Sequence, residues 1–118
     1  MNQSAVLQIH DLKSRPLFEL DDAYDILPFI MSITSKSKIQ IDGLAAQLDF
    51  SKREKKKIEI IQEKQNKALK SWSEKMRRLG VIPCALFEVK FPAIGGFYYW
   101  KHPSGELIFM NDISQKVH

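Results

Sequence analysis

The sequence has few of the residues that cross-link a small protein or carry it across a membrane. Cys84 is the single cysteine among 118 residues, so no internal disulfide can form and the fold must depend on packing. No apolar run approaches the ~18 residues that a membrane span needs. The first residues also lack the basic segment and sustained apolar stretch of a secretion signal. We therefore expect one cytoplasmic domain over residues 1–118, with flexible ends and no membrane association.

Residues that hold metals or phosphates are also scarce. The three histidines are scattered, and no Cys or His pair has the spacing of a metal site. Gly95-Gly96 is not a phosphate loop, because no Lys-Ser/Thr pair and no helix follow it. The sequence thus predicts no cofactor, and it gives no reason to expect a small-molecule ligand.

Two features could carry catalysis, but each has a simpler interpretation. His102 and Glu106 flank a predicted turn, and an imidazole beside a carboxylate could act as a general base. No nucleophile or oxyanion site accompanies them, so we interpret them as a surface pair. Cys84 has apolar neighbours, which raise the pKa of a thiol, and we expect it to be a small buried hydrophobe.

The net charge of +4 is unevenly distributed along the chain. Residues 1–50 carry 4 basic and 7 acidic side chains, whereas residues 51–80 carry 11 basic and 4 acidic ones. Nearly all of the excess basic charge therefore belongs to one segment. A solvated helix face explains this pattern, and an acidic first half could also favour pairing with a basic second half.

The strongest periodic pattern predicts a long helix over residues 51–79. Apolar or small residues recur there at spacings of three and four and form one stripe. The stripe consists of Ile58, Ile61, Ala68, Leu69, Trp72, Met76 and Leu79. Ser51 and Glu54 have the spacing of a capping box, and Gly80 suits a left-handed helix end with Val81 folded back on the last turn. The helix is longer than a compact domain needs, so its stripe requires a partner of similar length.

A second helical pattern begins at about Leu20. Its apolar residues repeat at helical spacing, and they are Ala23, Ile26, Leu27, Ile30, Met31 and Ile33. Pro28 would kink this helix if the helix begins near Glu19, and it would be harmless if Asp25 caps the helix. We expect the helix to fray over Ser32 to Lys38 and to break at Asp42-Gly43.

After Gly80 the hydrophobic period changes to two, which is typical of strands. The pattern predicts a strand over residues 85–91, an aromatic strand over residues 97–102 and a returning strand over residues 106–111. Pro103-Ser104-Gly105 suits the hairpin turn between the last two. Val6 to Ile9 could add a fourth strand.

Helices first and strands last favour the α+β class over an alternating α/β fold. We expect a long antiparallel helical hairpin over about residues 20–80. A short three-stranded antiparallel sheet should follow it within residues 81–111.

Several short motifs, taken in order, resemble a family of small uncharacterised bacterial proteins. They are Phe18 to Ala23, Ile26-Leu27-Pro28, Leu79-Gly80-Val81, Phe91-Pro92-Ala93, Gly96, Tyr99-Trp100 and Gly105-Glu106. Phe109 to Asp112 replaces the family's Trp-His pair, and Ile113 to His118 lacks its Gly-Phe-Arg tail. The resemblance implies a helical hairpin with a sheet and a bacterial cytoplasmic setting. The family has no established activity, so the resemblance implies no catalytic residue.

The predicted helix over residues 51–79 carries a row of basic side chains beside its apolar stripe. At about 100° per residue, they project within about 80° of one another. The row consists of Arg53, Lys57, Lys64, Lys67, Lys75 and Arg78. Such a row could follow the phosphates of a nucleic acid. Glu59, Glu63 and Glu74 flank it, as in an ordinary solvated helix.

The aromatic run from Phe97 to Trp100 could stack on nucleic-acid bases. Strand alternation places Tyr98 and Trp100 on one face, with Phe97 and Tyr99 on the other. One of these faces must cover the helices, so we interpret the run mainly as core.

Three classes of function remain open at this point. We favour a non-enzymatic, oligomeric protein-interaction module, whose long apolar helices pair with a second copy to form a dimer. The first alternative is binding of nucleic acid or another polyanion through the basic row. The second is an enzyme of unknown reaction, for which the residues supply no catalytic constellation.

Overall fold

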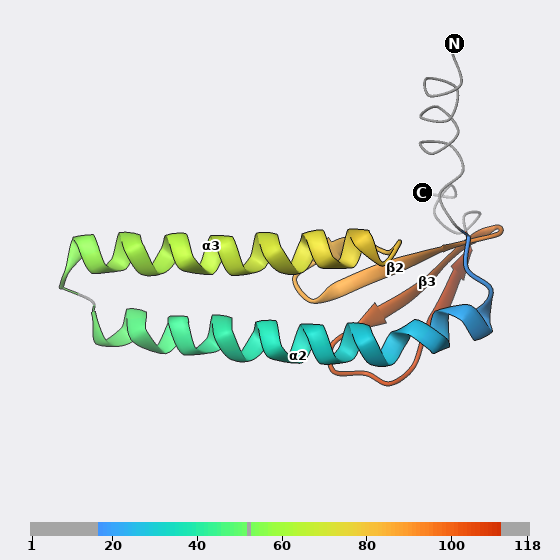
Figure 1. Cartoon of the computed structure of the whole chain (residues 1–118), viewed down its shortest axis with the longest axis horizontal. Helices are drawn as coiled ribbons and strands as arrows, with labels where there is room; N and C mark the ends of the chain where they lie inside the picture. Colours follow the sequence, from blue (N-terminus) through green and yellow to red (C-terminus); the bar gives the residue numbers. More distant parts are fainter. Residues whose placement is uncertain (1–16, 52, 112–118) are drawn as a thin grey trace, which may run out of the picture.

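The computed structural model describes residues 17–51 and 53–111. Two helices and four strands follow one another, with helices first. They are α2 (Leu20–Phe50), α3 (Lys55–Arg78), β1 (Ile82–Ala85), β2 (Glu88–Ala93), β3 (Gly96–Lys101) and β4 (Ile108–Asn111). The helices form an antiparallel hairpin, and the strands form one antiparallel sheet in the order β1-β2-β3-β4. The predicted α+β class is confirmed (Figure 1).

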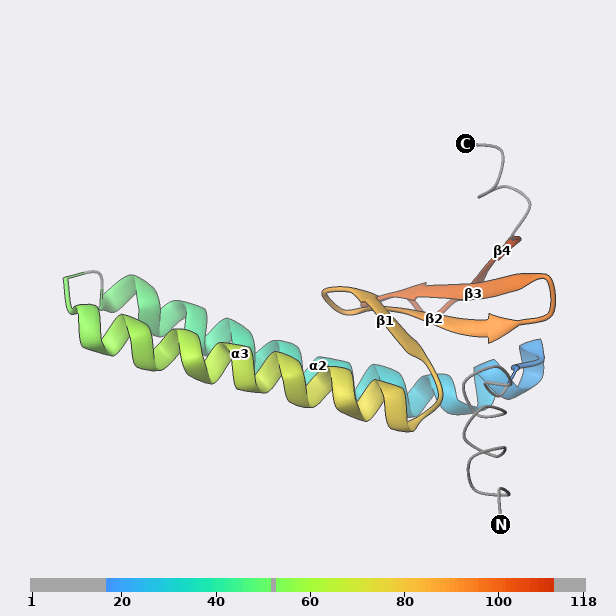
Figure 2. The same ribbon diagram turned by 90° about the horizontal axis from the view of Figure 1, so that it is seen from above.

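The sheet covers only part of the hairpin. It lies on one side of the helices, over the half nearest the start of α2, while the other half extends beyond the sheet (Figure 2). We call residues 20–34 and 71–78 the proximal half, and residues 35–50 and 55–70 the distal half. The radius of gyration is 17.9 Å, compared with about 13.5 Å for a compact chain of this length.

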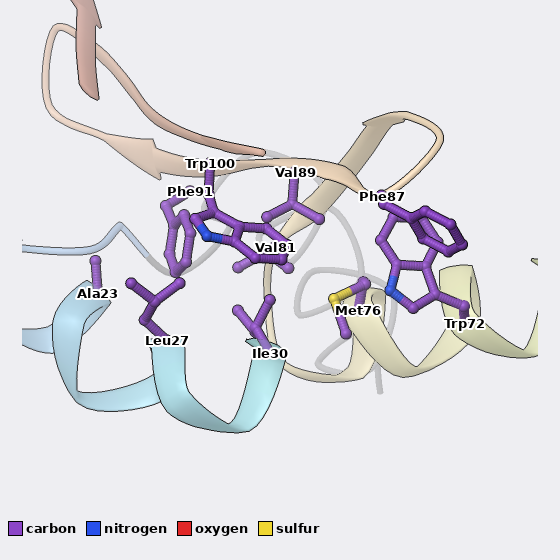
Figure 3. Packing of buried hydrophobic residues seen from close by; sticks show 10 residues of the cluster. All are labelled: Ala23, Leu27, Ile30, Trp72, Met76, Val81, Phe87, Val89, Phe91 and Trp100. Carbon is purple, nitrogen blue, oxygen red and sulfur yellow. The ribbon is translucent and has the colours of Figure 1, made fainter. Parts of the chain in front are cut away.

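The core lies between the sheet and the proximal half (Figure 3). Both predicted apolar stripes point into it, from Ala23, Leu27 and Ile30 on α2 and from Trp72 and Met76 on α3. The sheet side contributes Val81, Phe87, Val89, Phe91 and Trp100. Burying large apolar side chains on three elements at once fixes the sheet against the helices.

A buried hydrogen bond joins the two helices where the proximal half ends. Trp72 Nε1 donates to Thr34 Oγ1 at 2.9 Å, and both residues are almost fully buried. The bond satisfies the indole N–H and the hydroxyl in an apolar environment, where leaving either unpaired would be costly. It also sets the two helices in register.

α3 ends as the sequence predicts. Gly80 has a φ of 88°, a left-handed conformation that favours glycine. Its N–H donates to the Arg77 carbonyl, and the Val81 N–H donates to the Met76 carbonyl. These two bonds form a Schellman motif and direct Val81 into the core.

The N-terminus of α3 differs from the prediction of a helix over residues 51–79. Ser51 ends α2, donating its N–H to the Leu48 carbonyl, while Glu54 precedes α3 without a side-chain cap hydrogen bond. The predicted capping box is therefore wrong. The short connection between the helices uses the residues that the pattern assigned to a helix start.

α2 is continuous through the positions where the sequence predicts fraying and a break. Lys38 and Asp42 form an exposed ion pair one turn apart, and Gly43 lies inside the helix. Packing against α3 through the buried Leu44 outweighs the modest cost of one helical glycine. Pro28 also lies inside the helix, and the first turns tilt away from the remaining axis in Figure 1.

The sheet has four strands, so the prediction of three is wrong. Leu86 and Phe87 form a turn that divides the predicted strand over residues 85–91 into β1 and β2. Phe87 has a φ of 59°, which is unfavourable for a bulky residue. Its buried ring packs edge-on against Trp72 at 5.5 Å, and this burial offsets the cost of the turn.

The connection between β3 and β4 is longer than the predicted tight turn at residues 103–105. β3 ends at Lys101 and β4 begins at Ile108. Trp100 Nε1 donates to the Ser104 carbonyl at 2.6 Å, and the Leu107 N–H donates to the Tyr24 hydroxyl at 3.1 Å. The loop thus folds onto the helix instead of closing at once. The predicted strand at Val6 to Ile9 and the flexible ends lie outside the described residues.

Candidate functional site

The broad face of the hairpin turned away from the sheet carries the candidate site. Two hollows, each of about 320–330 Å³, lie along the distal half of this face. The first is lined by Gln40, Leu44, Lys64, Lys67, Ala68 and Ser71. The second is lined by Gln47, Phe50, Ser51, Lys57, Ile60, Ile61 and Lys64. Lys64 borders both, so the hollows form one shallow groove with an apolar floor and lysines at its rim.

Helical periodicity extends this face along the whole hairpin. On α2, the residues of this face are found by counting back from Gln47 in steps of seven, four or three residues. On α3, they are found by counting forward from Lys57 in steps of three or four residues. We call this surface the open face. It consists of Asp22, Asp25, Phe29, Ile33, Lys36, Gln40 and Gln47 on α2, and Lys57, Ile60, Lys64, Lys67, Ser71, Lys75 and Arg78 on α3.

The structure places the predicted basic row mainly on this face. Lys57, Lys64 and Lys67 line the groove, and Lys75 and Arg78 follow at helical spacing in the last turns of α3. Arg53 lies in the connection before α3. All six side chains of the row are exposed.

Two of these cations have acidic neighbours. Lys57 pairs with Glu54 at 2.9 Å and Lys67 with Glu63 at 3.4 Å. Each pair is one helical turn long and exposed, and such pairs contribute little to stability. Within residues 17–51 and 53–111, the other four members of the row form no ion pair, and their charge is available to a partner.

The open face also carries large apolar side chains that nothing in the described chain covers. Phe29 is 64% exposed and Ile60 is 53% exposed. Phe50 is 92% exposed at the end of the hairpin. Exposed apolar side chains rimmed by polar residues mark surfaces that bind a partner.

The open face has one acidic end. Asp22 and Asp25 lie in the first turns of α2, both exposed. Asp22 lies in the first turn, where the positive end of the helix dipole favours a carboxylate, and Asp25 follows about one turn later. The face is therefore acidic at the start of α2 and basic along α3.

His102 and Glu106 do not form the pair considered from the sequence. Pairing of β3 with β4 ends at Tyr99 with Ile108, so the two residues are not cross-strand partners. The His102 ring instead lies 6.2 Å from both the Phe87 and Trp100 rings. No group of three His, Cys, Asp or Glu side chains within the described ranges could hold a metal ion.

Cys84 is exposed, so the prediction of a buried cysteine is wrong. The bulge that separates Pro83 from Ala85 displaces it from the regular alternation of β1. Partial burial still raises the pKa of the Cys84 thiol, although the nearby Lys90 ammonium opposes this effect. A thiol with a raised pKa is a weak nucleophile at neutral pH.

The outer face of the sheet holds a tyrosine–carboxylate pair that the sequence did not reveal. The Tyr99 hydroxyl donates to Glu88 Oε1 across β3 and β2, and this hydrogen bond raises the pKa of Tyr99 to about 12. Lys90 lies over the Phe97 ring at 4.4 Å. Trp100 and Tyr98 pack against the core beneath the sheet instead, which confirms the core interpretation for that side of the aromatic strand.

No helix within the described residues is long and apolar enough to cross a membrane. No family model matches the chain, and no curated protein or solved structure matches it either. The resemblance to the small bacterial proteins therefore stays a prediction.

Proposed function

We propose that this protein is a non-enzymatic interaction module that associates with a second copy of itself through the helical hairpin. The observation that carries the proposal is the uncovered open face, where Phe29 and Ile60 expose more than half of their surface. A helical hairpin with one bare face completes its core by pairing with another hairpin. A two-fold pair uses the same surface on both copies, so one bare face per chain is sufficient.

The mass of the protein in solution tests this proposal. Sedimentation equilibrium of the full chain at micromolar concentrations should give a dimer that persists on dilution. The double variant Phe29→Gln with Ile60→Gln should dissociate at least about tenfold more readily, because it removes apolar area from the interface. Ile94→Gln is the matched control, since Ile94 is 82% exposed in the turn between β2 and β3 and does not belong to the open face. A wild-type chain that stays monomeric would end the proposal.

Binding of nucleic acid or another polyanion is a second candidate. It is favoured by Lys64, Lys75 and Arg78, which follow one another along the open face of α3 and form no ion pair with the described part of the chain. Several phosphate contacts would make the affinity for short DNA or RNA fall by orders of magnitude between about 50 and about 200 mM salt. The triple variant Lys57→Glu, Lys64→Glu and Arg78→Glu should abolish this binding. Unchanged binding in the triple variant would exclude the basic row as the site.

A further inference from the structure

We infer that two copies pair through their open faces with the hairpins parallel, so that α2 of each copy lies over α3 of the other and both sheets are at the same end. This inference rests on the proposed self-association and specifies its geometry. It follows from the distribution of charge over the open face and from the two ways in which a two-fold axis can relate such faces.

Two limiting arrangements bring the open faces together with closed symmetry. If the two-fold axis runs along the helices, the hairpins are parallel and α2 faces the partner's α3. If the axis runs across them in the plane of the interface, the hairpins are antiparallel, α2 faces the partner's α2, and α3 faces the partner's α3. The residues brought into opposition differ completely between the two.

The antiparallel arrangement opposes like charges. The cations of the open face extend from Lys57 near the start of α3 to Arg78 at its end. Reversing the direction of α3 places each row over the other, so that the Lys57 end of one copy meets the Arg78 end of the next. Opposed like charges across an interface suppress that pairing.

The parallel arrangement opposes unlike charges at the proximal end. The hydrogen bond between Trp72 and Thr34 marks one level on both helices. Asp25 lies nine residues from Thr34 toward the sheet end, about 13 Å, and Arg78 lies six residues from Trp72 in the same direction, about 9 Å. The carboxylate of each copy therefore lies within reach of the partner's guanidinium, and Asp22 and Lys75 flank this contact.

The same register places neutral groups against the remaining lysines of α3, and it places Lys36 of α2 at the level of the partner's Ser71. Gln40, six residues beyond Thr34, lies at the level of the partner's Lys64 and the partner's Lys67. Gln47 lies at the level of the partner's Lys57 and the partner's Ile60. Amide oxygens accept hydrogen bonds from ammonium groups. Phe29 lies at the level of Lys75 and Arg78, whose aliphatic stems can cover its ring.

A pair of charge-reversal variants tests this geometry. The first carries Asp22→Lys and Asp25→Lys, and the second carries Lys75→Glu and Arg78→Glu. All four residues are exposed, so neither variant disturbs the core. In the parallel dimer each variant alone opposes like charges at both symmetry-related contacts, and its dimer dissociation constant should rise about tenfold.

Mixing the two variants should restore association. In a mixed dimer, the reversed α2 of one chain meets the reversed α3 of the other, and the two unchanged segments meet at the second contact. Sedimentation of an equimolar mixture should therefore recover the wild-type dimer fraction, and intermolecular attraction alone explains this rescue. The matched control carries Asp21→Lys and Lys70→Glu, at positions outside the open face, and should dimerise like the wild type.

The outcomes separate the geometry from the proposed function. A wild-type dimer whose variants neither dissociate alone nor recover on mixing would overturn the parallel arrangement and leave self-association intact. A tighter dimer from Lys75→Glu with Arg78→Glu would also overturn it, because this variant relieves repulsion only in the antiparallel pair. A wild-type monomer would overturn the proposed function itself.

Discussion

The two halves of the helical hairpin have similar backbones and different neighbours. In the proximal half, Ile30 and Met76 have no exposed surface because the sheet covers them. In the distal half each helix has only the other helix to pack against, and Phe50 and Ile60 remain exposed. The comparison teaches that the sheet adds a covering layer over only one half of the hairpin, while the open face stays uncovered along both halves.

Substitution of matched isoleucines measures this difference most directly. Ile30→Ala should lower the free energy of unfolding by about 4 kcal/mol, whereas Ile61→Ala should cost about 2 kcal/mol. Ile30 is enclosed by α2, α3 and the sheet, while Ile61 borders an open hollow. Denaturant unfolding at one fixed protein concentration checks both values. Equal losses would mean that the distal half is as tightly packed as the proximal one.

The hydrogen bond between the helices should have the next largest effect. Thr34→Val keeps the shape of the side chain but leaves the buried Trp72 N–H without its acceptor, at a cost of about 1–3 kcal/mol. Thr34→Ser retains the hydroxyl and should cost less. The indole N–H resonance of Trp72 should shift only in the valine variant, and equal destabilisation by both variants would contradict the assigned role.

Glycine substitutions inside α2 and just after α3 should change stability in opposite directions. Gly43 lies inside α2, and an added Cβ there would meet open space, so Gly43→Ala should stabilise the protein by about 0.5–1 kcal/mol. Gly80 has a φ of 88°, and an added Cβ would lie 3.4 Å from the Phe18 ring. Gly80→Ala should therefore destabilise the protein by about 1–2 kcal/mol. Thermal unfolding of both variants checks the signs, and slower amide exchange around residue 43 should accompany the gain.

The smallest effect concerns the outer face of the sheet at high pH. The hydrogen bond to Glu88 raises the pKa of Tyr99 to about 12, compared with about 10 for an unperturbed tyrosine. The folded protein thus holds this proton more tightly than the unfolded chain does. The resulting stabilisation is complete below about pH 10 and is lost as the pH rises through about 12.

Glu88→Gln provides the test of this pair. It removes the negative charge and should return the ionisation of Tyr99 toward about pH 10. Ultraviolet titration of the phenol groups measures the change, and Tyr99→Phe identifies which transition belongs to this residue. A late transition that survives in Glu88→Gln would assign the raised pKa to another cause.

Much of the fold could be predicted from local patterns. The stripe that includes Trp72 and Met76 predicted the buried face of α3, and the stripe that includes Leu27 and Ile30 did the same for α2. Gly80 predicted the end of α3, because a left-handed cap followed by an apolar residue is a local signal. These features depend on neighbours three or four residues apart, so the sequence contains them directly.

The errors fall where distant contacts outweigh local preference. Asp42-Gly43 is a turn signal, yet packing on α3 keeps α2 helical there. The residues from Ala85 to Phe91 alternate like one strand, yet packing against Trp72 draws Phe87 into a turn. The sequence predicted only the α3 side of the open face. Because a break in α2 was expected, the run of residues from Asp22 through Phe29 to Gln47 was not recognised as one helical face.

The sequence by itself determined the two helical stripes, the order of helices before strands and the row of basic residues on one side of α3. Only the tertiary structure decided that the sheet covers one end of the hairpin and that the basic row shares a bare face with Asp25 and Phe29. The physical reason is that periodicity specifies which side of an element is apolar, whereas the length and placement of the covering layer depend on contacts between residues far apart in the chain.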